Sequence, residues 1–403
     1  MILVLFLQEK TGMLFYNAKI FQGEYGFKNG GFEVRDGKFI DVFFDKDNCT
    51  DGVDLEGNYV IPGLIDIHTH GNMNADFSDG SRDGLETMAG YLLKNGITGF
   101  LPTSMTLPFE NLKESFKNAE KVSRINRTGT SRILGIHMEG PFLSEKHKGA
   151  QNSEYLKLPD FDAFCGLQKA CNNLIKIVDI APELEGAEIF IKKAVSENPP
   201  VTVSLAHTDA DYETAKKAFE TGAHHVTHLF NGMPSLHHRA PGVIGAVADR
   251  DDIIVELICD GLHVHPSVVR MAFKLFPHRI CLISDALRCC GMPDGKYELG
   301  GQEVVLKAGE ARLKNGTIAG SATNLFECMK NAISFGVPME LAIEAATNTP
   351  AKSIGMQDCI GSIDVGKYAD YIVCDKDLNI LSIFKDGNNC MDSKILKHLV
   401  YNN

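Results

Sequence analysis

Six side chains of the kinds that bind divalent metal ions follow short apolar segments of this chain. His68 and His70 stand two residues apart at the end of one such segment. In an extended strand, residues i and i+2 project from the same face about 7 Å apart, so both imidazoles can reach one ion. The other four each follow an apolar segment of their own: Glu139, His207, His228 and Asp285. This series predicts a hydrolase that holds one or two divalent ions.

The chemistry expected of these residues follows from their types. Glu139, His207 and His228 supply the three protein ligands that are typical of a catalytic ion, which leaves one position open for water. Asp285 can take a proton from water that the ion has made acidic and return it to a leaving group. Alone, His207 and His228 could equally be hydrogen-bonded histidines without a metal, and Asp285 could be a helix cap or part of a surface salt bridge. The common position of these residues after apolar segments favours a metal site.

Further histidines lie close to this set. His137 shares the face of Glu139 by alternation, so it is either another ligand or a group that orients one. For His224 and His225, which lie deeper in the segment before His228, we expect a structural role. His263 could contact a substrate hydroxyl or phosphate, or have a structural role.

The segment 229–242 carries a local positive charge in an acidic chain. Arg239 lies beside His237 and His238. A guanidinium suits a phosphate or carboxylate through paired, charge-assisted hydrogen bonds, although an exposed arginine is usually only solvated.

Eight strand-like segments, alternating with amphipathic helical patterns, must position these residues. They are 60–67, 97–103, 132–138, 175–181, 201–206, 223–228, 253–259 and 279–284. Eight parallel strands close a (β/α)8 TIM-like barrel, whose active site lies at the carboxyl ends of the strands. The six residues follow the first, third, fifth, sixth and eighth segments. One expected helix has apolar residues at 212, 215, 218 and 219, after a capping-type Thr208-Asp209.

The sequence pattern at both chain ends differs from that of the middle: short β-type runs are broken by Gly and Asp. We therefore expect an α/β protein with two domains. Residues 1–62 and 358–403 would form a small β-sandwich, with 1–12 as a disordered extension. Residues 63–357 would form the metal-dependent catalytic barrel.

The composition excludes some partners. The chain has 403 residues and a net charge of -12, which gives no general attraction to nucleic acid or anionic lipid. Its 11 cysteines form no CxxC pair, as expected of reduced thiols in a cytoplasmic protein. No run approaches the roughly 20 apolar residues of a membrane span.

The motifs around the six residues resemble the N-acetylglucosamine-6-phosphate deacetylases of the amidohydrolase superfamily, over nearly the whole chain from about Met13. The stretches that carry the resemblance are 62–71, 137–142, 206–208, 227–234, 260–263, 284–286 and 319–321. The first stretch is common to many amidohydrolases, whereas the Glu-Gly-Pro and Asn-Gly-Met-Pro motifs are much more specific to this one family.

The resemblance implies release of acetate from N-acetyl-D-glucosamine 6-phosphate, giving glucosamine 6-phosphate for amino-sugar catabolism or cell-wall recycling. It gives Asp285 the role of base and then acid. The metal, one or two ions of Zn, Fe, Mn or Co, would be held by Glu139, His207 and His228, with His68 and His70 holding a second ion.

The resemblance also implies how the sugar phosphate is bound. His263, Asn231 and the backbone near Gly232 and Ala319 would contact it. Arg239 and His238 would bind the phosphate across the interface of a homodimer.

One position departs from the family's pattern. Some members have a histidine after Lys-Gly-Thr or Lys-Gly-Ala that polarises the acetamide carbonyl, whereas here Lys148-Gly149-Ala150 precedes Gln151. A glutamine amide can donate a hydrogen bond to the oxyanion but cannot carry a positive charge. Carbonyl activation would therefore depend more on the metal.

Three alternatives remain at this point. The chain could be a deacetylase of N-acetylgalactosamine 6-phosphate, a cyclic amidase or a non-catalytic scaffold. Many cyclic amidases bridge their ions with a carboxylated lysine after the fourth strand, but here that segment ends Ala181-Pro182-Glu183. A scaffold protein would normally have lost metal ligands, and this chain keeps all six.

Overall fold

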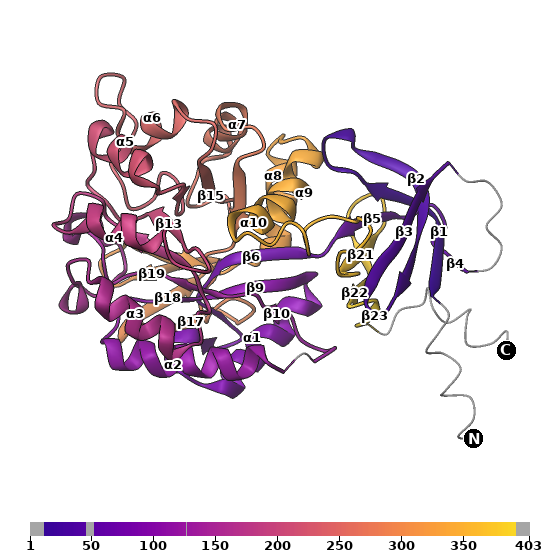
Figure 1. Cartoon of the computed structure of the whole chain (residues 1–403), viewed down its shortest axis with the longest axis horizontal. Coiled ribbons are helices and arrows are strands. Elements are labelled where there is room, and N and C mark those ends of the chain that lie inside the picture. Colours follow the sequence, from indigo (N-terminus) through magenta and orange to yellow (C-terminus); the bar gives the residue numbers. More distant parts are fainter. Residues whose placement is uncertain (1–11, 46–51, 126, 392–403) are drawn as a thin grey trace.

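The chain folds into a parallel barrel surrounded by helices and a separate mixed sheet built from both ends of the sequence (Figure 1). This computed structural model describes residues 12–45, 52–125 and 127–391. The expected extension 1–12 lies outside the described residues except for its last position. The α/β class and the (β/α)8 barrel are as predicted.

Eight strand positions make up the barrel, and neighbouring strands run parallel. They are β6 (Leu64–Thr69), β9 (Ile97–Ser104), β10 (Arg132–Ile133) with β11 (Ile136–Met138), β12 (Ile175–Ile180), β13 (Thr202–Leu205), β14 (His225–Val226), β15 (Ile254–Ile258) and β16 (Ile280–Ile283). The Asp285 backbone N–H donates to the His68 carbonyl at 2.9 Å, and Thr69 bridges Ala286 in parallel. These contacts close the barrel between its last strand and its first.

Two predicted strands are each divided in the structure. The segment 60–67 becomes β5 (Tyr59–Pro62), which joins the end sheet, and β6 of the barrel. Gly63 lies between them, where a Cβ would come within 2.2 Å of the Thr98 hydroxyl. The segment 132–138 divides at Gly135, where a Cβ would lie 2.2 Å from Cγ of Lys176. Each strand is therefore interrupted at a glycine, where another segment of the same chain approaches closely.

Ten α-helices lie outside the barrel strands in the described ranges. They are α1 (Arg82–Lys94), α2 (Phe109–Ser123), α3 (Phe161–Ala170), α4 (Ala187–Ala194), α5 (Tyr212–Thr221), α6 (Gly242–Ala248), α7 (Pro266–Leu275), α8 (Leu325–Ser334), α9 (Met339–Ala346) and α10 (Asn348–Ser353). None of these described helices has the length and apolar composition needed to cross a bilayer.

Helix α5 buries the apolar face that its amphipathic sequence pattern predicts. Ala215, Ala218 and Phe219 are buried, as their helical spacing predicts. The predicted cap is wrong, because the Asp211 side chain accepts the hydrogen bond at the amino end. Thr208 instead donates to Glu183.

The end sheet has eight strands around an aromatic core. They are β1 (Met13–Phe21), β2 (Phe27–Arg35), β3 (Lys38–Phe44), β4 (Val53–Asp54), β5, β21 (Tyr371–Cys374), β22 (Ile380–Lys385) and β23 (Asn388–Asn389). Lys38 bridges Tyr368, so the sheet folds back on itself. Phe15, Phe32 and Tyr371 pack inside it. On this topology we propose the division into 1–62 with 358–403, and 63–357.

A second small sheet, which the sequence did not lead us to expect, follows the barrel's last strand. It is antiparallel and consists of β17 (Gly295–Leu299), β18 (Gln302–Lys307), β19 (Glu310–Leu313) and β20 (Ile318–Ser321). Short elements complete the fold: β7 (Gly71–Asn72), β8 (Ala75–Asp76) and the 3-10 turns Gly23–Tyr25, Phe77–Asp79, Glu145–His147 and Ser153–Tyr155.

Candidate metal centre and substrate cavity

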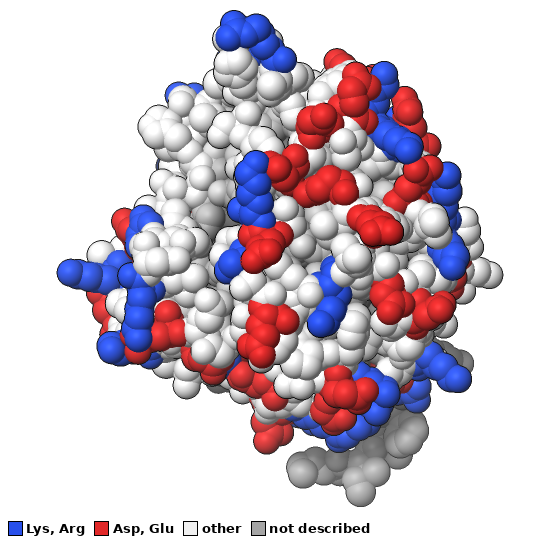
Figure 2. Space-filling view, turned by 90° about the vertical axis from the view of Figure 1, so that its left-hand side faces the viewer, with Lys and Arg blue, Asp and Glu red and all other residues white. Residues whose placement is uncertain are grey.

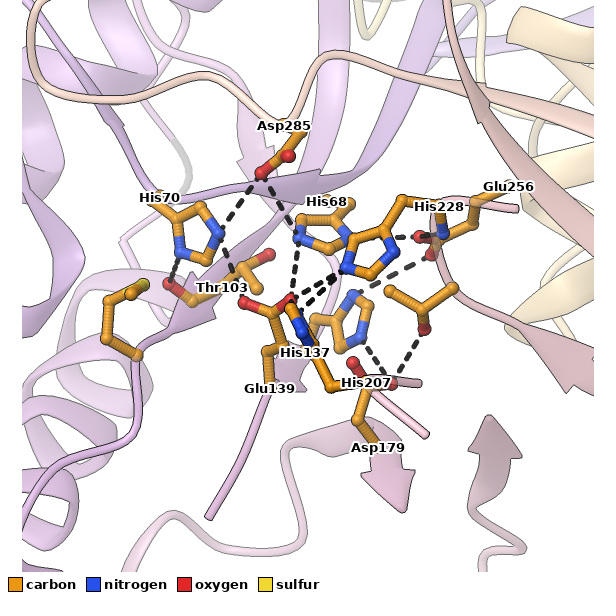
Figure 3. Close-up of polar contacts among 12 residues, drawn as sticks. His68, His70, Thr103, His137, Glu139, Asp179, His207, His228, Glu256 and Asp285 are labelled. Carbon is orange, nitrogen blue, oxygen red and sulfur yellow. Dashed lines mark hydrogen bonds and ion pairs between the residues drawn. The ribbon is translucent and has the colours of Figure 1, made fainter. Parts of the chain in front are cut away.

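The six predicted metal-site residues meet at the carboxyl ends of the barrel strands (Figure 3). Three of them have left-handed backbones, with φ of 41° at His207, 31° at His228 and 48° at Asp285. Such angles are uncommon for residues other than glycine and concentrate at functional sites. The chain therefore turns sharply at these residues, after the strands end.

Glu139, His207 and His228 form the tighter of two groups, which we call the Glu139 group. Oε1 of Glu139 lies 3.0 Å from Nε2 of His207 and 3.1 Å from Nε2 of His228, and these two nitrogens are 3.1 Å apart. Nδ1 of His207 donates to the His147 carbonyl at 2.8 Å, which leaves the lone pair on Nε2. Lone pairs from three buried side chains thus point to one place, as a cation requires.

His68, His70 and Asp285 form the looser group, which we call the Asp285 group. Oδ1 of Asp285 lies 3.3 Å from Nε2 of His70 and 3.5 Å from Nε2 of His68. Glu139 reaches this group too, at 3.3 Å from His70 and 3.8 Å from His68. Glu139 is therefore placed to bridge two ions.

The far nitrogens of both imidazoles in the Asp285 group have partners. Nδ1 of His70 contacts the Thr103 carbonyl at 3.1 Å, and Nδ1 of His68 contacts Glu256 at 2.9 Å. Nε2 of His68 is buried and makes no hydrogen bond within the described chain. A buried nitrogen with a free lone pair fits a metal ligand, since such groups are otherwise satisfied.

The histidines around Glu139 stabilise its charge. Burial alone would raise the pKa of Glu139, but the neighbouring imidazoles of His207, His228 and His70 hold that pKa well below its usual range. The carboxylate is therefore ionised, as a ligand must be.

The pKa values of the two imidazoles in the Asp285 group are shifted in opposite directions. Burial lowers the pKa of His68, and the nearby His137 lowers it further, so His68 is neutral. Burial also disfavours the charged form of His70, but Asp285 and Glu139 outweigh it and raise the pKa of His70 well above its usual range. The two carboxylates thus favour positive charge between them, which a metal ion would also supply.

His137 lies beneath the centre. Its Nδ1 contacts the Ile67 carbonyl at 2.9 Å and its Nε2 contacts Asp179 at 3.0 Å. Burial would lower the pKa of His137, but Asp179 outweighs burial and raises it to about 9. Both nitrogens therefore carry hydrogens, so this geometry favours an orienting role over that of a ligand. Nδ1 of His225 contacts Ser204 at 2.9 Å, as a structural histidine would.

A cavity of about 270 Å³ opens above the two groups. Five of the predicted substrate contacts line it: Gln151, Asn231, Gly232, His263 and Ala319. Thr317, Ile318 and Gly320, which the sequence reasoning missed, also line it, because β20 of the unexpected sheet reaches the cavity.

Gln151 is held firmly at the wall of this cavity. Its Oε1 accepts from the Thr106 backbone N–H at 2.7 Å, and its Nε2 donates to Oε2 of Glu139 at 2.8 Å. The amide orientation therefore follows from the hydrogen bonds, and beyond the bond to Glu139 Nε2 makes only a long, weak contact with Sδ of Met105, at 3.9 Å.

His263 is fixed on the other side by Asp260, at 2.7 Å from its Nδ1. Burial would lower the pKa of His263, but the hydrogen bond and charge of Asp260 outweigh burial and raise it. Asp260 therefore favours the protonated form of His263, which would offer an N–H to an anionic substrate.

Two predicted contacts do not line the cavity of their own chain. His238 and Arg239 are exposed on the segment before α6, where Nη1 of Arg239 lies 2.7 Å from Nε2 of His238. Elsewhere on the surface, acidic and basic side chains are interspersed, as Figure 2 shows for one end of the molecule.

Sequence reasoning also missed two carboxylates of the barrel interior, Asp179 and Glu256. Both are fully buried and contact histidines of the site. A signal was present, because Glu256 interrupts the apolar strand Ile254–Ile258. Buried charges of this kind are rare without a partner or a metal.

The barrel and its two groups of ligands have the arrangement of a metal-dependent hydrolase, and comparisons with known proteins agree. The sequence profile of the amidohydrolase family matches residues 59–394. N-acetylglucosamine-6-phosphate deacetylase of Vibrio furnissii is 36% identical over 357 residues, which cover 87% of each chain. N-acetylgalactosamine-6-phosphate deacetylase of Escherichia coli O157:H7 is 33% identical over 334 residues, 82% of this chain and 88% of that protein.

A solved structure is also similar over most of its length. It is a mutant N-acetyl-D-glucosamine-6-phosphate deacetylase of Mycobacterium smegmatis in complex with N-acetyl-D-glucosamine-6-phosphate. Its TM-score is 0.88 at 29% identity, and the match covers 94% of this chain and 100% of that one. The chain belongs to the amidohydrolase family, within its group of N-acetylglucosamine-6-phosphate deacetylases, which confirms the resemblance seen in its motifs.

Proposed function

We propose that this chain hydrolyses the acetamide bond of N-acetyl-D-glucosamine 6-phosphate and releases acetate and D-glucosamine 6-phosphate. The observation that carries this proposal is the convergence of Glu139, His207 and His228 within 3.1 Å of one another, beneath a cavity of about 270 Å³. Relatives that match most of the chain bear the names of deacetylases of such sugar phosphates.

Two ion positions are proposed. The Glu139 group would hold the main ion and the Asp285 group would hold a second, and Glu139 would be able to reach both. Imidazole and carboxylate ligands accept Zn, Fe, Mn or Co. A divalent cation bound here polarises the amide carbonyl and lowers the pKa of a coordinated water.

Asp285 moves the proton. Its carboxylate contacts His70 and also lines the cavity. It can therefore accept a proton from the attacking water. It then donates this proton to the departing nitrogen. Amides resist hydrolysis because the amine leaves poorly, so the tetrahedral adduct would otherwise revert.

The cavity wall binds and orients the substrate. Gln151 offers its remaining amide N–H to the acetamide oxygen, in the position where some relatives have a charged histidine. His263, Asn231 and the backbone at Gly232 and Ala319 contact the sugar and its phosphate.

A homodimer completes the site. Arg239 and His238 bind the phosphate bound to the partner chain, since neither lines its own cavity. Coexpression of Asp285→Asn with Arg239→Ala tests this, because one site of the mixed dimer would have both wild-type residues. Activity that exceeds both single variants is expected, and activity no higher than theirs would contradict the exchange.

The residues of this chain also help to choose among the alternative functions. A cyclic amidase bridged by a carboxylated lysine is disfavoured, since Ala181-Pro182-Glu183 follows β12. The galactosamine epimer stays a real competitor, because a deacetylase of that substrate is among the relatives. A cytoplasmic location suits the cysteines, which are free and mostly buried in the described chain.

Acetate release measured side by side on both N-acetyl 6-phosphate epimers tests the proposal, with unphosphorylated N-acetylglucosamine as control. We expect fastest turnover on the glucosamine 6-phosphate. Equal turnover without the phosphate would contradict the role of His263 and Arg239, and the absence of acetate release would refute the proposed function.

A further inference from the structure

Glu256 is a buried carboxylate in the barrel interior that the mechanism above does not use. It stands in β15 between Val255 and Leu257, and its side chain is fully buried. Branched apolar side chains usually fill such a barrel, and a buried carboxylate costs free energy unless it is paired. Oε1 of Glu256 makes no hydrogen bond within the described chain and lies 3.8 Å from Nδ1 of His137, too far for a hydrogen bond. Packing alone does not explain a glutamate at this position.

The other oxygen of Glu256 contacts both halves of the metal centre. Oε2 lies 2.9 Å from Nδ1 of His68, and it accepts from the backbone N–H of His228 at 3.2 Å. Figure 3 shows the His68 ring between Glu256 on one side and Asp285 on the other. Glu256 thus touches a side chain of the Asp285 group and the backbone of the Glu139 group.

The contact with Nδ1 determines what His68 offers to an ion. A neutral imidazole has one N–H, and an acceptor at Nδ1 keeps that hydrogen there and the lone pair on Nε2. Nε2 then faces Asp285 at 3.5 Å and Glu139 at 3.8 Å.

His68 is distinctive among the ligands in having a carboxylate at this place. The Nδ1 atoms of His70 and His207 contact backbone carbonyls, of Thr103 and His147. Either kind of acceptor can set the tautomer. A side-chain carboxyl group takes this place at His68 of the looser group.

We infer that Glu256 is a positioning residue for the second ion, because it fixes the tautomer and orientation of His68. The inference rests on the proposed function only in taking His68 as a ligand. It predicts that loss of Glu256 weakens the second ion while the Glu139 group keeps the first.

Glu256 could instead belong to a separate ion site with His68 and His137, since their ligand atoms lie close together. The contacts of His137 argue against this. Its Nδ1 contacts the Ile67 carbonyl and its Nε2 contacts Asp179, so neither nitrogen has a lone pair to offer.

Two variants and a control test the inference on the full-length protein. Glu256→Met removes the acceptor at similar length, whereas Glu256→Gln keeps one oxygen that can accept from both N–H groups. Ser204→Ala is the control, because Ser204 is a buried polar residue of the same barrel that contacts His225 and Thr227 but no ligand. Equilibrium dialysis against Zn²⁺ with elemental analysis then counts the ions bound at each free concentration.

We expect two ions in the wild type and in Ser204→Ala. In Glu256→Met the second ion should bind about 10–100-fold more weakly, the usual effect of removing such a partner, while the first is unchanged. Glu256→Gln should recover most of the second-ion affinity. The inference is overturned if Glu256→Met binds both ions normally or loses both equally, if Glu256→Gln is as impaired as Glu256→Met, or if the wild type saturates with one ion.

Acetate release from the same samples separates this inference from the proposed function. A wild type that binds one ion and releases acetate refutes the inference alone, whereas one that binds two ions without turnover refutes the function alone. Should Glu256→Met fail to fold, ¹⁵N NMR of labelled wild-type histidines decides. Protonation of His68 at Nδ1 is expected, and protonation at Nε2 would overturn the inference.

Discussion

The Glu139 group and the Asp285 group share a carboxylate but differ in how closely their atoms approach. Contacts within the first are 3.0–3.1 Å, whereas those of the second are 3.3–3.5 Å. Preorganised ligands need little rearrangement when an ion binds, so the first group should bind its ion more tightly. If both ions bind as proposed, the difference predicts one ion that turnover always needs and a second whose binding depends on supporting residues.

The largest expected effect comes from the residue that both groups share. Glu139→Gln removes the charge and the ability to bridge, so we expect loss of both ions. Turnover should fall about 10⁴-fold, since metal stabilisation is worth several kcal/mol and each 1.36 kcal/mol is tenfold. Elemental analysis and acetate release measure the two effects. Glu344→Gln, at a buried carboxylate of α9 that contacts His278, is the matched control. Normal metal content in Glu139→Gln would contradict the role of Glu139 as the ligand that both groups share.

Asp285→Asn should separate proton transfer from binding. The amide keeps an oxygen near His70 but cannot accept and return a proton, so kcat should fall about 10³-fold, within the range for general acid–base catalysis. KM should change little. Steady-state kinetics provide the test, with Asp162→Asn, at an exposed position of α3, as control. If kcat stays near normal, another group carries the proton.

A smaller effect should distinguish the groups directly. His70→Asn removes a ligand of the Asp285 group only, so the first ion should stay and the second should be lost. We expect turnover to fall about 10–100-fold, because the main ion still stabilises the oxyanion. Ion counts and kcat should be measured on the same preparation. Simultaneous loss of both ions would mean that the centre binds metal as one unit.

The smallest effect is expected at the cavity wall. Gln151→Leu removes the hydrogen bond to Glu139 and the N–H offered to the acetamide oxygen. The hydrogen bond to the acetamide oxygen contributes about 1–2 kcal/mol, so turnover should fall about tenfold. Steady-state kinetics of Gln151→His should be compared with those of the wild type. If this variant were faster than the wild type, the charged residue of some relatives would be the better catalyst.

Much of this arrangement could be predicted from the sequence, because the barrel places its ligands where apolar segments end. His207 and His228 were identifiable in this way, and the structure brings them together. The residues behind them were not, since Glu256 and Asp179 lie inside strands rather than after them. A search at strand ends therefore finds ligands but misses the groups that orient them.

Other features depend on contacts between distant segments. Nothing in the continuous apolar run around Gly63 reveals that β5 belongs to the end sheet, because the break arises from the approach of Thr98. The sheet β17–β20 was missed because its strands alternate polar and apolar residues without a place in the eightfold repeat. The partner chain that Arg239 would contact also lies beyond what one sequence specifies.

Removal and return of metal ions tests the central claim most directly. Chelator-treated protein should release no acetate, and titration with Zn²⁺ or Mn²⁺ should restore turnover as the Glu139 group fills first and the Asp285 group second. Elemental analysis at each step should show the tight ion bound before activity appears. Full turnover by protein without metal would contradict the account.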